Sequence, residues 1–167
     1  MFTNFENMPQ QTDKAIKFFF PAQGITLRNR NKLKDYLRSM LKKEGKKLDY
    51  LNYIFCSDDY LLEINKQYLQ HDYYTDIITF DLSSDSSLIE AEIYISVDRV
   101  RDNSHKHHTT IQEEMYRVIF HGILHLCGYT DKTEGEKARM RAKEDYYLKN
   151  YTSSVSRDTV SGRNSVP

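Results

Sequence analysis

HGILHLCGYTD, residues 121–131, is the segment that decides how this chain is expected to fold. Its two histidines, His121 and His125, are four residues apart, so on an α-helix they lie on the same face, one turn above the other. Gly128 can adopt a positive φ without strain at a Cβ atom, which lets the chain turn sharply out of the helix. That turn would bring Asp131 back over the face that carries both imidazoles.

Two imidazoles and one carboxylate form a zinc site of the open, catalytic type, in which the fourth position is left to water. The surrounding helix is apolar, where two unpaired imidazoles would be costly to bury and metal coordination gives them a reason to be present. We therefore predict one Zn²⁺ ion held by His121, His125 and Asp131, with metal–ligand bonds of about 2.0–2.2 Å.

The rest of the chain predicts four strands and five helices in all, from apolar periodicity and turn residues. Strands are expected at residues 15–20, 48–56, 76–81 and 91–96. Helices are expected at residues 26–45, 57–69, 98–108, 111–126 and 133–150. The predicted fold is of class α+β, a four-stranded mixed sheet packed with about five helices, with a zinc-hydrolase-like site on a C-terminal helix.

The predicted organisation has three parts. Residues 1–13 are polar and aperiodic and are expected to form a flexible leader. Residues 14–151 are expected to form a single metal-dependent hydrolase domain, since a chain of 167 residues is about the size of one domain. Residues 152–167 contain almost no large apolar side chains and are expected to be a disordered tail.

Composition narrows the class of protein. The formal net charge of +0 excludes a uniformly basic nucleic-acid coat, although a local basic patch remains compatible with it. No apolar run approaches the roughly 20 residues that span a bilayer. The amino terminus lacks the regions of a secretory signal, and two cysteines are too few for a secreted disulfide scaffold. A soluble cytoplasmic protein without a membrane partner is expected.

Charge is unevenly distributed along the chain. Residues 28–47 carry nine lysines and arginines against two acids, and we call this segment the basic stretch. One interpretation is a solvated helix face, and the other is a surface that follows the phosphates of a nucleic acid.

The spacing of the ligand motif equals that of the metzincin proteases, H-E-x-x-H-x-x-G-x-x-H. Their glutamate acts as the general base, and Gly122 stands at that position here. Because glycine cannot accept a proton, a metallopeptidase built on this motif would lack its base.

Over roughly residues 15–148 the sequence resembles the bacterial YbeY family. The family pattern H-G-x-L-H-L-x-G-Y-D-H appears as residues 121–131. The family stretch P-T-D-V-L-S-F is similar to YYTDIITFD at residues 73–81, and G-D-I-x-I-S is similar to AEIYIS at residues 91–96. Glu136 and Met140 also stand where the family has similar residues.

The resemblance implies a zinc-dependent, single-strand-specific endoribonuclease. Such an enzyme would act in maturation of ribosomal RNA, particularly the 3′ end of the small-subunit RNA, and in ribosome quality control. The implied partners are ribosomal RNA and the small ribosomal subunit. Two other classes stay open on the residues alone: a metallopeptidase-like hydrolase, and a non-catalytic assembly factor in which the metal only stabilises the fold.

The chain departs from the family pattern at two places. Asp131 stands where the family has its third histidine, with Thr130 in place of the preceding aspartate, so the site is less positive by one charge. Leu69 stands where many members carry an arginine that is expected to contact RNA phosphate. Lys66 or another base would have to supply that contact here.

Two residues at the start of the strand predicted at residues 76–81 are candidates for orienting the substrate or a ligand histidine, namely Thr75 and Asp76. Turn chemistry explains them equally well. His71 is a candidate for the rim of the site. Cys127 is expected to be a small core residue, since a thiolate ligand would close the site.

Three more histidines form a cluster that is expected to be a solvated turn, with metal binding as the alternative. They are His105, His107 and His108.

Overall fold

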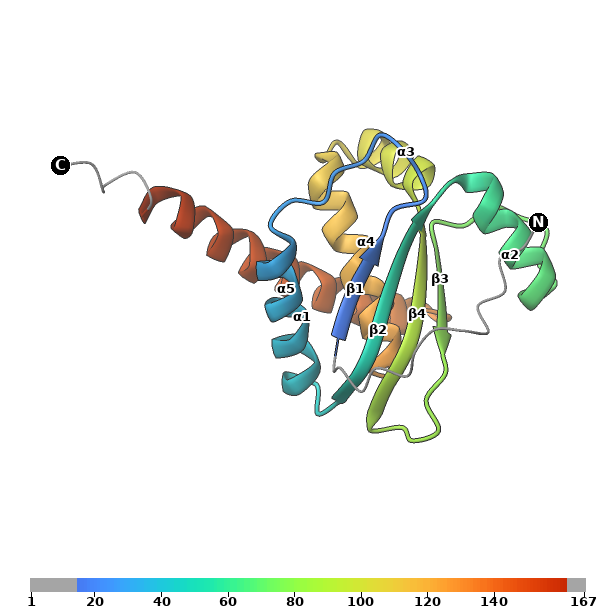
Figure 1. Ribbon diagram of the computed structural model, residues 1–167, viewed down its shortest axis with the longest axis horizontal. Coiled ribbons are helices and arrows are strands. Elements are labelled where there is room, and N and C mark those ends of the chain that lie inside the picture. Colours follow the sequence, from blue (N-terminus) through green and yellow to red (C-terminus); the bar gives the residue numbers. More distant parts are fainter. Residues whose placement is uncertain (1–14, 162–167) are drawn as a thin grey trace.

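The structure is a computed structural model that describes the backbone of residues 15–161 and the side chains as far as Arg157. The predicted leader at residues 1–13 lies outside the described residues. The described part contains four strands and five helices (Figure 1). The strands are β1 (Ala15–Phe19), β2 (Lys47–Cys56), β3 (Ile77–Asp81) and β4 (Leu88–Ser96). The helices are α1 (Arg30–Lys43), α2 (Asp58–Leu69), α3 (Val97–His107), α4 (Ile111–Leu126) and α5 (Glu134–Ser161).

The four strands form one mixed sheet in the order β1-β2-β4-β3. β1 pairs parallel to β2, and β2 pairs parallel to β4, while β3 closes the edge antiparallel to β4. The parallel connections need long crossovers, which α1 and α2 supply with the segments around them. The predicted α+β class and the four-stranded mixed sheet are confirmed.

The two faces of the sheet are covered differently. Alternate residues of β4, from Ile89 to Ile95, point into the main core, which is also lined by α1, α4 and α5. Tyr94 points to the opposite face and packs in a smaller cluster with Leu61 and Ile64 of α2. Figure 1 shows α4 behind the sheet and α2 beside its β3 edge.

α4 is the central helix of the main core. A capping box formed by Thr110 and Glu113 fixes its first turn, as the sequence predicts. Gly122 faces the sheet, where a Cβ atom would lie 2.8 Å from Cδ1 of Ile77 and 3.0 Å from Cδ1 of Ile93. The missing side chain therefore lets α4 approach β3 and β4 closely.

α5 continues beyond its predicted end near residue 150. No proline or glycine interrupts residues 151–161, and the helix runs to Ser161. Tyr151 is fully buried, Val155 packs against the core, and Lys32 Nζ donates to Ser154 O at 2.7 Å. The structure therefore has a helix over residues 152–161 where a disordered tail is predicted, because Val155 packs against the core and Ser154 O accepts from Lys32. Residues 162–167 lie outside the described part.

The last turns of α5 project beyond the rest of the domain (Figure 1). Among the helices that the structure describes, α5 included, none has the length and the apolar composition to cross a membrane.

Candidate metal centre

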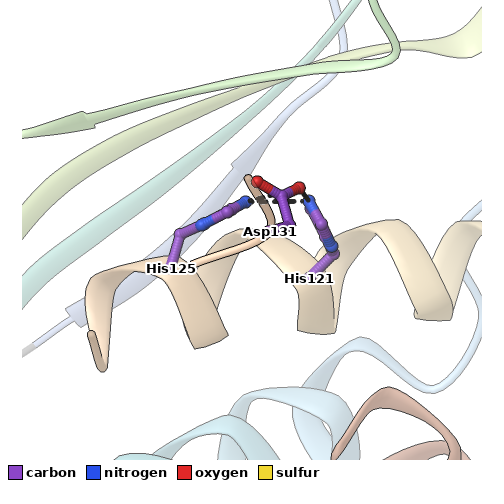
Figure 2. A group of neighbouring side chains, drawn as sticks. All are labelled: His121, His125 and Asp131. Atoms are coloured by element: carbon purple, nitrogen blue, oxygen red, sulfur yellow. Dashed lines mark hydrogen bonds and ion pairs between the residues drawn. The ribbon is translucent and has the colours of Figure 1, made fainter. Parts of the chain in front are cut away.

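The three predicted ligands meet at the end of α4. Figure 2 shows both histidine rings on the same side of α4, with the Asp131 carboxylate beside them on the loop that follows the helix. Oδ2 of Asp131 lies 3.6 Å from Nε2 of His121 and 3.6 Å from Nε2 of His125, and the two Nε2 atoms are 2.9 Å apart. Gly128, with φ of 96°, makes the turn that returns the chain to this face.

Two of the three distances between the donor atoms fit a zinc ion, and the third is shorter. A tetrahedral ion with bonds of about 2.0–2.2 Å has ligand atoms roughly 3.3–3.6 Å apart. The two distances to Asp131 match this value, and the shorter distance between the imidazoles is that of a hydrogen bond between two ring nitrogens. Imidazole nitrogen and carboxylate oxygen are also ligands that zinc prefers. In the part of the chain that the structure describes, these three residues form the group whose donor atoms all lie within 4.8 Å of one another and could share one ion.

Both rings are held by hydrogen bonds at the nitrogen that faces away from the group. His121 Nδ1 lies 2.7 Å from Oε1 of Glu144, and His125 Nδ1 lies 2.9 Å from the backbone oxygen of Tyr129. A carbonyl oxygen only accepts, so His125 donates from Nδ1 and its neutral form leaves Nε2 as a lone-pair donor to a metal. The carboxylate of Glu144 accepts from Nδ1 of His121 in the same way, so Nε2 of His121 also faces the group. Metal-binding histidines are commonly oriented in this way.

The two histidines are electrostatically different. Burial lowers the pKa of His121, but the hydrogen bond and charge of Glu144, with the charges of Asp76 and Asp131, outweigh burial and raise this pKa above its usual value. Burial and the neighbouring His121 lower the pKa of His125. In the arrangement described here, His121 is therefore the ring that more readily carries a proton, and it can donate that proton to His125 across the 2.9 Å contact.

Glu144 belongs to this site, and the sequence analysis missed it. It is 5% exposed, and it also accepts hydrogen bonds from Arg117 Nη1 at 3.1 Å and Arg141 Nη1 at 3.4 Å. A signal was present, because Glu144 shares the buried face of α5 with Met140 and Tyr147 at helical spacing. An acid in an apolar stripe requires a partner. Its partner His121 is 23 residues away in sequence, which local spacing does not show.

Glu44, at the end of α1, fixes the loop that carries Asp131. It accepts hydrogen bonds from Tyr129 Oη at 2.9 Å, from Lys143 Nζ at 2.8 Å, and from Tyr147 Oη. Burial raises the pKa of Glu44, but these three hydrogen bonds outweigh burial and lower it below the usual value. Since the backbone oxygen of Tyr129 holds His125, this carboxylate links α1 to the candidate metal centre.

Thr75 and Asp76 lie near the group without touching its ligands. Among the described residues, neither makes a hydrogen bond to the three predicted ligands. Thr75 Oγ1 donates to Ile77 O at 3.3 Å, and Asp76 Oδ2 accepts from Asn103 Nδ2 at 3.2 Å. Asp76 acts on His121 through its charge alone. A role of either residue in orienting substrate stays a prediction.

Of the other candidate residues, one shares a cleft with a predicted ligand, and the rest lie outside the ligand group. His71 lines a cleft of about 440 Å³ that His125 also lines, so it lies at the rim of the site. Cys127 is half-buried outside the ligand group, and burial with the nearby charge of Glu44 raises the pKa of its thiol to about 12. The three remaining histidines lie at the end of α3, on another helix from the ligand pair. They are His105, His107 and His108.

The structure also shows where the basic side chains considered for RNA binding lie. Leu69 ends α2 with 42% of its surface exposed, and Lys66, the suggested substitute for the family arginine, is paired with Asp72 at 3.0 Å. The basic stretch covers α1 and the turn after it, and its Glu44 contacts the loop after α4. The lysines that flank Glu44 are therefore at the end of α1 that faces the metal-centre loop.

Comparison with known proteins identifies the family of the chain. The model of the family described as endoribonuclease YbeY matches residues 22–152. An endoribonuclease YbeY from Cytophaga hutchinsonii is 51% identical over 136 residues, which cover 81% of this chain and 95% of the relative. One from Parabacteroides distasonis is 47% identical over 80% of this chain and 94% of the relative. A solution structure from Thermotoga maritima, 26% identical, superposes with a TM-score of 0.61 over 86% of this chain and 93% of the other. The chain belongs to the YbeY family.

Proposed function

We propose that this chain is a zinc-dependent, single-strand-specific endoribonuclease that matures ribosomal RNA in the cytoplasm. Its substrate would be the 3′ end of the small-subunit RNA, on or near the small ribosomal subunit, with a further part in ribosome quality control. Family membership supports hydrolysis of RNA. The observation that carries the metal chemistry is the convergence of two oriented imidazoles and one carboxylate at the end of α4.

In this proposal His121, His125 and Asp131 hold the ion. When bound, zinc polarises a phosphoryl oxygen and lowers the pKa of a bound water toward about 7. The chain's own contribution is orientation. Glu144 and the Tyr129 carbonyl hold each ring by its Nδ1 nitrogen, so both Nε2 atoms already point to the shared position. Preset ligands of this kind reduce the reorganisation that binding and reaction require.

A comparison of RNA cleavage by the parent protein and by His125→Ala tests this function. The matched control is His105→Ala, which removes an exposed imidazole at the end of α3. We expect the parent and the control to cut single-stranded RNA, to leave duplex RNA and a casein-type peptide intact, and to contain one zinc per chain. His125→Ala should lose zinc and RNA cleavage while its circular dichroism spectrum stays that of the parent.

Each rival class gives a different result. Cleavage of the peptide would indicate a metallopeptidase. A zinc-loaded parent that cuts neither substrate would indicate a metal-stabilised assembly factor. RNA cleavage that persists at the parent's rate in His125→Ala would mean that the metal centre is not the catalyst.

A further inference from the structure

A cleft runs from the candidate metal centre toward the loop after α2. Its volume is about 440 Å³, within the usual range for ligand pockets of roughly 300–1,000 Å³. Of the three predicted ligands, His125 lines one part of it, so the cleft borders the metal group on the side of that ring. His71 and Tyr73 line another part, on the segment between α2 and β3.

The cleft has an aromatic wall and no strong cation. The rings of His71 and Tyr73 stack with centroids 5.1 Å apart and planes 22° from parallel, and Tyr73 is 57% exposed. Leu69 and Ile77 add apolar surface, and the lining residues include neither lysine nor arginine. A phosphate held here would find no guanidinium or ammonium partner, whereas a flat, uncharged base would find a ring to stack on.

The backbone that carries the aromatic wall is held in place before any ligand arrives. Asn65 of α2 is 1% exposed, and its Nδ2 donates to the backbone oxygen of Tyr73 at 2.8 Å. The backbone oxygen of Asn65 accepts from His71 N at 3.2 Å, and Gln70 between them has a φ of 56°. One buried residue thus holds both ends of the turn, so the two rings are presented at little further entropic cost.

We propose that this cleft binds one unpaired nucleobase of the RNA, stacked on Tyr73 and its partner His71, beside the bond that is cut. This inference rests on the proposed function and names the recognition element of the same site. It gives the protein a stacking contact beside Leu69, where the resemblance to the family implies an arginine. Preference for single strands follows, because a base paired within a duplex does not reach the ring.

The test uses zinc-loaded protein and a short single-stranded RNA that the parent cuts. Tyr73→Ala should lower kcat/KM by about 5- to 100-fold, mostly through KM, which is the effect of losing one base–aromatic stack. Tyr73→Phe keeps the ring and should stay within about two-fold of the parent. The matched control is Tyr60→Ala, which removes a tyrosine of α2 that is 47% exposed and does not line the cleft. Zinc content and melting temperature should be unchanged in all three.

Removal of single bases from the RNA then identifies the contact. In the parent, an abasic nucleotide at one position near the cut should lower kcat/KM as much as Tyr73→Ala does. In Tyr73→Ala the same abasic position should cost nothing further, because the stack is already lost. Losses that simply multiply at every position would mean that Tyr73 acts elsewhere, and the inference would be wrong.

The remaining outcomes separate the two proposals. If the parent cuts RNA and Tyr73→Ala behaves like Tyr60→Ala, the base site is refuted and the endoribonuclease function stands. If the zinc-loaded parent cuts no RNA, both proposals fail.

Discussion

Replacing Glu144 by glutamine tests whether the carboxylate behind His121 sets the affinity of the metal centre. Oε1 of Glu144 lies 2.7 Å from His121 Nδ1, and Oε2 accepts from Arg117 Nη1 at 3.1 Å. A glutamine keeps one oxygen and gains an NH₂ group, so it cannot accept from both neighbours. Either the ring loses its acceptor, or an amide donor faces the guanidinium. In either case the hydrogen bond that orients the His121 ring, with Nε2 pointing to the ion, is weakened.

The size of the effect follows from these contacts. Loss of a partner that orients a metal-binding histidine typically lowers metal affinity about 10- to 100-fold. For Glu144→Gln the loss of zinc affinity should be about tenfold, or about 1.4 kcal/mol, because the amide oxygen can still accept one hydrogen bond. For Glu144→Ala the loss should be close to 100-fold. In the metal-free protein, Glu144→Ala should also lower the free energy of unfolding by about 1–3 kcal/mol. The larger cost of breaking a buried ion pair is reduced because Arg117 keeps its 2.7 Å contact with Asp145.

Competition with a chromophoric zinc chelator measures the affinity, and thermal unfolding in excess chelator measures the stability. Asp145→Asn is the matched control, since it weakens the other partner of Arg117 without touching His121. Its zinc affinity should stay within about two-fold of the parent's. The reasoning is refuted if Glu144→Gln binds zinc as tightly as the parent. It is equally refuted if Asp145→Asn loses the same affinity, since the effect would then pass through Arg117.

Three further experiments test other parts of the structure. Asp131→His replaces an anionic ligand by a neutral one. Zinc should stay bound, and the pH optimum of hydrolysis should move downward because the metal becomes more Lewis acidic. Complete loss of zinc would mean that the loop after Gly128 accepts only a carboxylate. Gly122→Ala places a Cβ atom 2.8 Å from Cδ1 of Ile77. After the gain in helix propensity is subtracted, the substitution should lower the free energy of unfolding in urea by about 1–2 kcal/mol. Adding Ile77→Val should recover part of this loss, and strict additivity of the two substitutions would exclude the clash as its cause. A quadruple lysine-to-glutamine variant of the basic stretch should weaken RNA binding, flatten its salt dependence by about 0.7 in slope per phosphate contact, and leave the zinc content unchanged; parent-like salt dependence would leave the stretch a solvated face. The four positions are Lys42, Lys43, Lys46 and Lys47.

Much of the fold and the core of the site could be predicted because their signals are local. His121 and His125 share a helix face by spacing alone, and Gly128 marks the turn that brings Asp131 back. The β-branched strands and the capping box at Thr110 are also local patterns, and the structure confirms them. In each case the residues that interact are within about a dozen positions of one another.

The parts that were missed depend on distant contacts. Glu144 and Glu44 act on the site from α5 and α1, which the ligand motif does not mention. The predicted end of α5 was wrong because the anchor of its last turns is the core around Tyr151, not the polar residues that follow it. The cleft joins Tyr73 to His125 across some fifty residues of chain, and only the folded sheet brings the two together.

The close packing at Gly122 bears on how enzymes of this ligand spacing can diverge. A glutamate at position 122 would give the motif the residue that serves as general base in the metzincin proteases. Here the new side chain would enter the contact between α4 and the isoleucines of β3 and β4, 2.8 Å from the first of them, and bury a carboxylate among alkyl groups. Such a substitution would destabilise the packing of α4 on the sheet. The shape of the hydrophobic core around Gly122 therefore disfavours the very residue on which a metzincin protease depends.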